Sequence, residues 1–555
     1  MPFLQKNQTI DLSIDGYTAE GAGVGRAEKL AVFVPGALKG ETVRCLIIKC
    51  AKRYAVGKLL EVLAPSPHRI APECPYFARC GGCSLQAMDY AEQLDFKRQR
   101  IEDAFARIGN LSVPCLPVMG MELPFRYRNK GAFPVGCSPQ GPEIGLFASR
   151  SHRIVPVTDC LLQSADTKNL LSAVHTYLAQ SGARPYDEKT HTGLLRHIVV
   201  RQNEQRQSLV CLVSTAPLPK PELLISLLQN ALPGLYGVVQ NLHRRPSNVI
   251  FGEEETLLWG KDALPICLCG FKFEVSARSF FQVNLAQAEK LYLHALSLAG
   301  LTGRETVVDA YCGVGSMSLL FAQHTKEVIG IECVAPAVQN ARLNAQKNNV
   351  SNVRFLCDLA ENALPRLFDE GLSCDVLLLD PPRKGCDRAV LETAARLNIP
   401  KIVYVSCDPA TQARDAAILS SLGYSCGPVQ GVDMFCQTAH VETVCLLSHK
   451  SPDSHINVTV EFGEGEGKVP LDKIVERAKQ HQPAPKATYK LIQEYVEMKY
   501  GFKVHTAYIA EVKRELGLPM YDAPNAAEGL KQTRKHPTQE KVNAIKDALN
   551  YYNLI

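Results

Sequence analysis

The chain has 555 residues, and at about 150 residues per domain this length predicts three to four domains rather than one core. Its composition, 46% hydrophobic and 21% charged with a mean hydropathy of −0.06, is globular and excludes fibrous and disordered classes. No stretch resembles the about 18–20 apolar residues of a membrane span, and the N-terminus lacks a signal-peptide pattern. We therefore expect a soluble protein of the cytoplasm.

Net charge and cysteine content carry further information. The formal net charge is +5, and residues 1–150 hold 19 Lys and Arg against 14 Asp and Glu, so the basic excess lies there. This hints at a polyanionic partner, although a charge this small also fits an ordinary solvated surface. The 20 cysteines, without a secretory signal, are expected as reduced thiols, some with chemical roles, rather than as disulfides.

The first 65 residues alternate apolar and polar side chains with period two, for example at Ile10, Leu12 and Ile14. Glycine-rich breaks separate these runs, and the pattern predicts a small antiparallel barrel or meander. Several Lys and Arg residues are interleaved with the strands. In the run GYTAEGAGVGR followed by VFVPGALKGE, the segment resembles a TRAM domain, an OB-like barrel that binds RNA.

Three cysteines follow in the run CPYFARCGGCSLQ, at positions Cys74, Cys80 and Cys83. Gly81 and Gly82 would let the backbone fold tightly around a bound group. Three closely spaced thiols are typical of a metal site and need a fourth ligand. Four thiolates suit either a [4Fe-4S] cluster or a structural zinc ion, and spacing alone does not distinguish the two.

The fourth ligand has three candidates between residues 84 and 160, namely Cys115, Cys137 and Cys160. We favour Cys160, because VPVTDC places it just after a predicted strand and before a helical stretch. Residues from about 100 to 270 otherwise have a mixed α/β pattern without a catalytic signature.

The segment FRYRNKGAF, residues 125–133, interleaves aromatic and cationic side chains. On an extended strand the aromatics would lie on one face and the cations on the other, which would suit base stacking combined with phosphate contact. A half-buried strand with a solvated outer face explains the same alternation.

From about residue 275 to 450 an apolar strand, a short loop and a helix alternate regularly. This rhythm predicts a doubly wound, mainly parallel sheet that binds its ligands at the carboxyl ends of the strands. The last hundred residues follow the glycine-rich run FGEGEGK and are expected to form a small helical appendage.

The motif DAYCGVG lies between a predicted strand and a helix, where Gly313 and Gly315 allow close approach of a ligand. Ser318 stands where a dinucleotide-binding motif has its third glycine, which disfavours a pyrophosphate. Glu332 ends the next strand, at a position suited to ribose hydroxyls. Together these features fit S-adenosylmethionine, although a glycine turn and a surface Glu are the simpler explanation of each alone.

Three further residues lie at predicted strand ends. Asp380 follows the apolar strand in LLLDPPRKG, and two prolines fix the chain beyond it. Cys407 ends the neighbouring strand in YVSCDPATQARD, where its thiol could be activated as a nucleophile. Glu442, in HVETV, points toward the same edge. A lone cysteine here would usually be packing, but its grouping with two carboxylates favours catalysis.

Together these motifs resemble the uracil-5-methyltransferase family of structured RNA, specifically the 23S rRNA branch that adds a TRAM domain and a [4Fe-4S] cluster. The resemblance runs over about residues 9–448. It rests on the motifs C-x5-C-G-G-C, SFFQVN, DAYCGVG, DPPRKG, SCDPATQARD and HVET, which occur in the family's order.

The resemblance implies a role for ten residues. The cluster ligands would be Cys74, Cys80, Cys83 and Cys160. The positions that hold S-adenosylmethionine would be Gln282, Tyr311, Glu332 and Asp380. Cys407 would be the nucleophile and Glu442 the proton acceptor. Two departures from the family pattern are Asp408, where Asn is common, and CDLAEN around Asp358, which lacks the usual Gly.

The fold class expected is therefore a multidomain α/β protein. Its parts are a TRAM barrel at 1–65, a central α+β iron-sulfur domain at 66–270, a Rossmann-like methyltransferase domain at 271–450, and a helical extension of unknown role at 451–555. We expect a monomer acting on 23S rRNA. The alternatives are the same reaction on transfer RNA, or a non-catalytic RNA-binding factor on this scaffold. A radical S-adenosylmethionine enzyme would need a C-x3-C-x2-C run that the sequence lacks.

Overall fold

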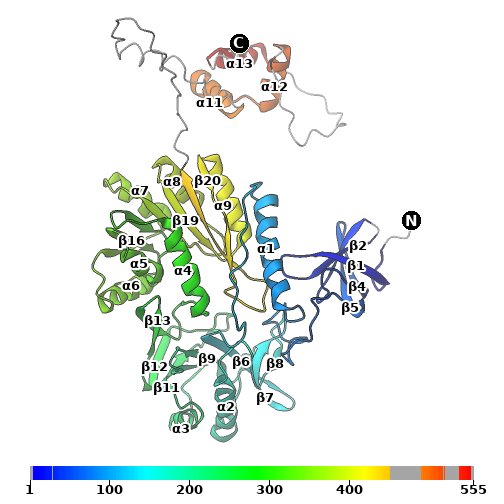
Figure 1. Ribbon diagram of the computed structural model, residues 1–555, viewed down its shortest axis with the longest axis vertical. Helices are drawn as coiled ribbons and strands as arrows, with labels where there is room; N and C mark the ends of the chain where they lie inside the picture. The colour runs from blue at the N-terminus through cyan, green and yellow to red at the C-terminus, as the bar shows by residue number, and fades with distance from the viewer. Residues whose placement is uncertain (1–3, 28, 450–488, 517, 519–536, 552–555) are drawn as a thin grey trace, which may run out of the picture. The chain divides into compact units, whose positions relative to one another are not determined.

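The computed structural model describes residues 4–27, 29–449, 489–516, 518 and 537–551. The chain divides into two compact units, Met1–Asp453 and Ser454–Ile555, and each is described by itself. Figure 1 labels the helices and many of the strands of the two units. None of the helices in the described ranges is long and apolar enough to cross a membrane.

The N-terminal strands close into a barrel, as predicted. In the order β1-β2-β3-β5-β4, it comprises β1 (Thr9–Tyr17), β2 (Gly23–Ala27), β3 (Leu30–Val34), β5 (Tyr54–Ala64) and β4 (Thr42–Cys50). Alternate residues such as Leu12, Val43 and Ile47 fill its interior and are at most 4% exposed. Closure leaves no unpaired strand edge, so a small module of this size is stable without a covering layer.

Helix α1 (Tyr90–Arg107) links the barrel to the rest of the first unit. Asp89 caps its N-terminus by accepting a hydrogen bond from the Glu92 backbone N–H at 2.8 Å. Glu92 in turn accepts a 2.8 Å hydrogen bond from the hydroxyl of Tyr17 in β1. Phe96 and Phe105 on the helix are buried.

A seven-stranded sheet forms the middle of the first unit. Its order is β12 (Glu254–Gly260), β11 (Leu235–Leu242), β10 (Ser208–Ser214), β9 (Leu195–Gln202), β6 (Lys130–Ser138), β7 (Gly141–Phe147) and β8 (Ile154–Pro156). One face packs on α2 (Thr167–Ser181) and α3 (Pro221–Ala231). The other face packs in part on the hairpin of β13 (Ala263–Leu268) and β14 (Phe271–Ser276).

The sequence-based prediction for residues 125–133 was wrong in part. Strand β6 begins only at Lys130, and Arg126 has a left-handed backbone with φ of 57°. The Arg126 guanidinium pairs with Asp159 at 2.7 Å, and the Tyr127 hydroxyl donates to the Cys436 carbonyl at 3.0 Å. These two contacts to distant residues replace the alternating strand, so the cations do not form one face.

The eight-stranded sheet has the expected doubly wound form. Its order is β17 (Val353–Cys357), β16 (Glu327–Glu332), β15 (Thr306–Asp309), β18 (Val376–Leu379), β19 (Lys401–Ser406), β22 (Glu442–His449) and β20 (Tyr424–Cys426), with β21 (Gln430–Val432) also paired to β22. The strands from β17 to β19 are parallel, and β22 is antiparallel to β19.

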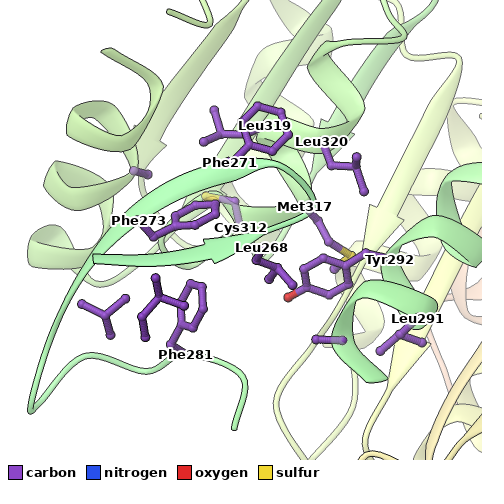
Figure 2. Packing of buried hydrophobic residues seen from close by; sticks show 14 of the residues in the cluster. Leu268, Phe271, Phe273, Phe281, Leu291, Tyr292, Cys312, Met317, Leu319 and Leu320 are labelled. Atoms are coloured by element: carbon purple, nitrogen blue, oxygen red, sulfur yellow. The ribbon is translucent and has the colours of Figure 1, made fainter. Parts of the chain in front are cut away.

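Helices cover both faces of this sheet. One face carries α4 (Leu285–Ala299), α5 (Ser316–Ala322) and α6 (Ala335–Lys347). The other carries α7 (Ala360–Asp369), α8 (Arg388–Arg396), α9 (Pro409–Ser421) and α1. Figure 2 shows Tyr292 of α4 beside Met317 of α5 in the first of these layers. Burying an apolar side chain of this kind stabilises the fold by about 1.5–3 kcal/mol. The helix layer that packs on this face of the sheet is therefore firmly packed.

The second unit, in its described residues, consists of α11 (Tyr489–Tyr500), α12 (Thr506–Glu515) and α13 (Gln539–Tyr551). Ile492, Val496, Ile509 and Ile545 are fully buried between them. The expected helical character of the C-terminal extension is therefore confirmed for these residues, while residues 451–488, 517, 519–536 and 552–555 of that prediction lie outside the described ranges.

Candidate functional site

The polar residues predicted at strand ends do meet at one edge of the eight-stranded sheet. Asp309 and Glu332 are the last residues of β15 and β16, while Asp380 and Cys407 directly follow β18 and β19. Glu442 is the first residue of β22. Because β22 runs antiparallel to β19, with Ser406 opposite Thr443, its beginning lies at the edge where the parallel strands end.

A cleft of about 640 Å³ opens at this edge. All six residues predicted to bind the methyl donor or to act in catalysis line it: Gln282, Tyr311, Glu332, Asp380, Cys407 and Glu442. The volume lies within the range of small-molecule sites. The cleft is thus large enough to hold a cofactor and a base together.

One end of the cleft is built around Glu332. Its carboxylate accepts hydrogen bonds from the backbone N–H groups of Gly313 at 3.2 Å and Val334 at 2.8 Å. Gly315 adopts φ of 84°, and a Cβ there would come within 2.9 Å of the Phe355 ring, so only glycine fits. These contacts fix one carboxylate at the rim of the cleft, where a ligand's hydroxyl groups could reach it.

The cleft also gathers Asp380, Glu442 and the half-buried Cys407. Burial, with repulsion from Asp309, raises the pKa of Asp380 to about 7. Burial and the nearby Asp380 raise the pKa of Glu442 to about 8, against the opposing effect of the Arg383 guanidinium. Burial and the two carboxylates raise the pKa of the Cys407 thiol to about 11. Three acids with shifted pKa values in one cleft are typical of a catalytic centre.

The segment Asp433–Val441, which leads into Glu442, is pinned by residues from elsewhere in the chain. Asp433 forms an ion pair with Lys97 of α1, and both side chains are fully buried. The Tyr90 hydroxyl donates a second hydrogen bond to Asp433 at 2.8 Å. Backbone carbonyls of the segment accept hydrogen bonds from Asn284, Gln287, Tyr127 and the N–H groups of Ser84 and Leu85.

Because Ser84 and Leu85 directly follow Cys83, this pinning connects the cysteine run to the wall of the cleft. The same segment supplies Phe435 and His440 to the cleft lining. A buried ion pair of this kind is costly to break, because removing one partner leaves an uncompensated charge.

Sequence reasoning missed several lining residues, among them Phe280, Arg383 and His440. Arg383 and His440 stand within motifs already recognised, three residues after Asp380 and two before Glu442 respectively. Phe280 is 80% exposed, which is unusual for a large aromatic side chain. An aromatic residue two positions before a predicted cofactor contact was the available signal for Phe280.

The four predicted cluster ligands, Cys74, Cys80, Cys83 and Cys160, line a second cavity of about 250 Å³. Cys115 and Cys137, the other candidates for fourth ligand, do not line it. Burial, together with the other three cysteines, raises the pKa of Cys83 to about 12. Among the described residues no three His, Cys, Asp or Glu side chains already form a compact set around one point.

The donor set nevertheless fits a metal group. Four half-buried thiolates would repel one another, and a bound cation is what keeps such thiols ionised. A single zinc ion needs all four sulfurs within about 2.3 Å of one centre. Thiols spread around a cavity leave room for a larger, polynuclear group.

Comparison with known proteins agrees with this arrangement. Residues 253–450 match the family model described as tRNA (Uracil-5-)-methyltransferase, and residues 4–60 match the TRAM domain. An uncharacterized RNA methyltransferase of Clostridium tetani is 44% identical over 448 residues, 80% of this chain and 97% of that protein. One of Listeria innocua is 42% identical over 449 residues, 80% of this chain and 99% of that protein.

Among solved structures, the chain is similar to the Pyrococcus abyssi tRNA (uracil-54, C5)-methyltransferase in complex with S-adenosyl-L-homocysteine. The TM-score is 0.65 at 25% identity, and the match covers 79% of this chain and 100% of that chain. Fold, cleft and relatives define the protein as an RNA methyltransferase. Within that class, the chain belongs to the RNA (uracil-5-)-methyltransferase family.

Proposed function

We propose that the protein transfers a methyl group from S-adenosylmethionine to C5 of a uridine in 23S ribosomal RNA, in the cytoplasm and as a monomer. The observation that carries the chemistry is that Cys407, Glu442 and Asp380 share one cleft with Glu332. A catalytically inactive protein that only binds RNA would not need these four residues in one cleft.

The cleft residues fit the methyl donor. Glu332, already oriented by two backbone N–H groups, would accept hydrogen bonds from the ribose hydroxyls. Gln282, Tyr311 and Asp380 would hold the remainder of the molecule between the apolar and acidic walls. When bound, S-adenosylmethionine supplies the methyl group on a positively charged sulfur. The Pyrococcus relative was solved with the demethylated product of this donor.

Uracil C5 is too weak a nucleophile to take a methyl group unaided. The Cys407 thiolate would add to C6, which pushes electron density onto C5. Once C5 carries the methyl group, Glu442 would remove the remaining C5 proton, so that the bond from C6 to Cys407 breaks and the ring recovers its double bond. The Arg383 guanidinium favours the ionised form of both groups. The target uridine must leave its stack to reach the cleft.

The other parts of the first unit would position the RNA. We assign RNA contact to the barrel at 1–65 and to the central domain at 66–270, with Cys74, Cys80, Cys83 and Cys160 holding a [4Fe-4S] cluster. Through Ser84, Leu85 and the segment Asp433–Val441, this cluster would also brace the wall of the cleft. The methyltransferase domain at 271–450 would carry out the reaction.

The same reaction on transfer RNA is the second candidate. It is favoured by the name of the matching family model and by the substrate for which the Pyrococcus enzyme is named. The TRAM barrel and the cysteine run favour ribosomal RNA, because both belong to the ribosomal branch that the sequence resembles.

Mapping 5-methyluridine in cells with and without the gene tests the proposal. We expect deletion to remove 5-methyluridine from at least one position of 23S ribosomal RNA, with transfer RNA unchanged. Loss from transfer RNA alone would assign the enzyme to the second candidate. An unchanged map of both RNA classes would contradict the function, and restoring the gene controls for secondary effects.

Removing one cluster ligand is expected to empty the metal site. Anaerobically purified protein should absorb near the blue edge of the visible range and contain about four iron atoms per chain. In Cys83→Ser or Cys160→Ser both signals should fall at least severalfold, because a thiolate ligand is lost. Cys137→Ser, outside the cavity, should retain them and is the matched control. One zinc per chain without iron would refute the cluster.

A further inference from the structure

A third cavity, on the central sheet, shares no lining residue with the catalytic cleft and adjoins the four-cysteine cavity. It has a volume of about 290 Å³. Its apolar lining comes from Ala132 and Pro134 of β6, Leu146 and Phe147 of β7, and Ile250, and its polar lining comes from His152, Glu188, His197, Ser247 and Asn248. We propose that this cavity binds one base of the substrate RNA, outside the methylated uridine.

One residue that lines the cavity carries a buried polar atom without a partner. His197 of β9 is only 9% exposed, and its Nδ1 atom has no hydrogen-bond partner among the described residues. Leaving such an atom unpaired costs roughly 1–3 kcal/mol. A ligand in the cavity that hydrogen-bonds to Nδ1 after a small movement of the ring would recover that free energy.

Two aromatic rings line the same cavity. The rings of Phe147 and His152 are 5.1 Å apart between centroids and inclined by 32°. His152 is held in place by Glu188, whose carboxylate lies 2.8 Å from its Nδ1. A flat base can pack on such a surface, and the amide of Asn248 and the hydroxyl of Ser247 offer both donors and acceptors to its edge.

The loop that supplies Ser247 and Asn248 to the lining is held by several hydrogen bonds. Arg196, 4% exposed, donates hydrogen bonds to the carbonyls of His243 at 3.2 Å, Arg245 at 2.8 Å and Ser247 at 3.0 Å. The His243 ring lies 3.1 Å from the Ser247 hydroxyl. The loop that carries Ser247 and Asn248 is therefore preorganised, which lowers the entropy cost of binding.

Exposed cations lie near the lining residues in sequence. Arg153 and Lys189 directly follow His152 and Glu188, Arg150 lies two residues before His152, and within the described part of the chain none of the three has an acidic partner within 4.0 Å. Arg244 and Arg245 flank the loop on its other side and pair with Glu254 and Glu253. Cations around an aromatic pocket are the pattern by which proteins hold a single-stranded backbone and one of its bases.

Strand β6 and the residue before it join the third cavity to the framework of the catalytic cleft. Ala132 and Leu146 line both this cavity and the four-cysteine cavity, which Lys130 also lines. Just before β6, Asn129 donates a 2.9 Å hydrogen bond to the carbonyl of Gln282, which lines the catalytic cleft. The third cavity is therefore held in the same framework as the cleft, and a nucleotide other than the target uridine could enter it.

The inference rests on the proposed function only in naming RNA as the ligand, and ultraviolet crosslinking tests it without requiring methylation. The wild-type protein is irradiated with 23S ribosomal RNA, and separately with transfer RNA, from cells lacking the gene. We expect nucleotides attached to peptides that contain residues 147–152 or 247–250. Crosslinks confined to the barrel or the catalytic cleft would overturn the inference, even if methylation is confirmed. Crosslinks at the cavity without any methylation would overturn only the proposed function.

A double variant, His152→Ala with Asn248→Ala, tests the contribution to binding. Both side chains are exposed at the rim, so the fold should be unchanged, which thermal melting can verify. We expect the KM for the methylated RNA to rise about tenfold, in line with the loss of one stacked base, with kcat within about twofold. The control is His175→Ala. His175 is exposed on α2, on the other side of the sheet, and its substitution should change neither the KM nor the kcat. An unchanged KM in the double variant would overturn the inference.

Discussion

Cys407→Ala is expected to reduce the rate of methylation by about 10⁴-fold or more, because the thiolate that activates C5 is absent. The substitution removes a single sulfur atom from a half-buried residue and leaves strand β19 and helix α9 intact. Transfer of labelled methyl groups from S-adenosylmethionine to RNA measures the loss. The affinity for RNA should stay within about twofold, because binding depends on surfaces outside this one thiol.

The matched control for this prediction is Cys357→Ala. Cys357 ends β17 near the same edge of the sheet, but it is exposed and does not line the cleft. The Cys357→Ala variant should methylate RNA at the rate of the unmodified protein. If Cys407→Ala retained sustained turnover, another group would have to add to C6 and the assignment of the nucleophile would be wrong.

Most of the catalytic cleft could be predicted from the sequence because strand ends are local features. Asp380 and Cys407 each follow a short apolar run, and the topology of a doubly wound sheet brings such ends together. Even Glu442 follows this rule, since an antiparallel strand begins where its parallel neighbours end. The periodicity and the order of the elements were enough to predict that these residues meet in one cleft.

Contacts between distant segments could not be predicted in this way. Arg126 was expected on a strand, but its ion pair with Asp159 and its left-handed backbone end the alternation before Lys130. The buried pair of Lys97 with Asp433 joins residues 336 positions apart, and nothing in either local sequence indicates the other. The third cavity likewise combines five separate segments, so no single motif marks it.

Glu442→Gln is expected to trap the enzyme covalently on its RNA. The amide has nearly the shape of the carboxyl group but cannot accept the C5 proton, so the methylated ring stays attached to Cys407. Denaturing gel electrophoresis after incubation with RNA and S-adenosylmethionine should show most of the protein in a band retarded by the RNA. Turnover should fall by about 10²–10⁴-fold, the usual contribution of a positioned base.

The raised pKa of Glu442 predicts that release of the covalent adduct depends on pH in the unmodified enzyme. Since its pKa is raised to about 8, Glu442 is mostly protonated at pH 6 and ionised at pH 9. Release of the adduct should therefore be slow at pH 6 and accelerate as the pH rises through about 8. The matched control is Glu392→Gln, on the exposed face of α8, which should behave as the unmodified enzyme. Adding Cys407→Ala to Glu442→Gln should abolish the RNA-retarded band on the denaturing gel. Only free protein in the Glu442→Gln lane would show that another group removes the proton.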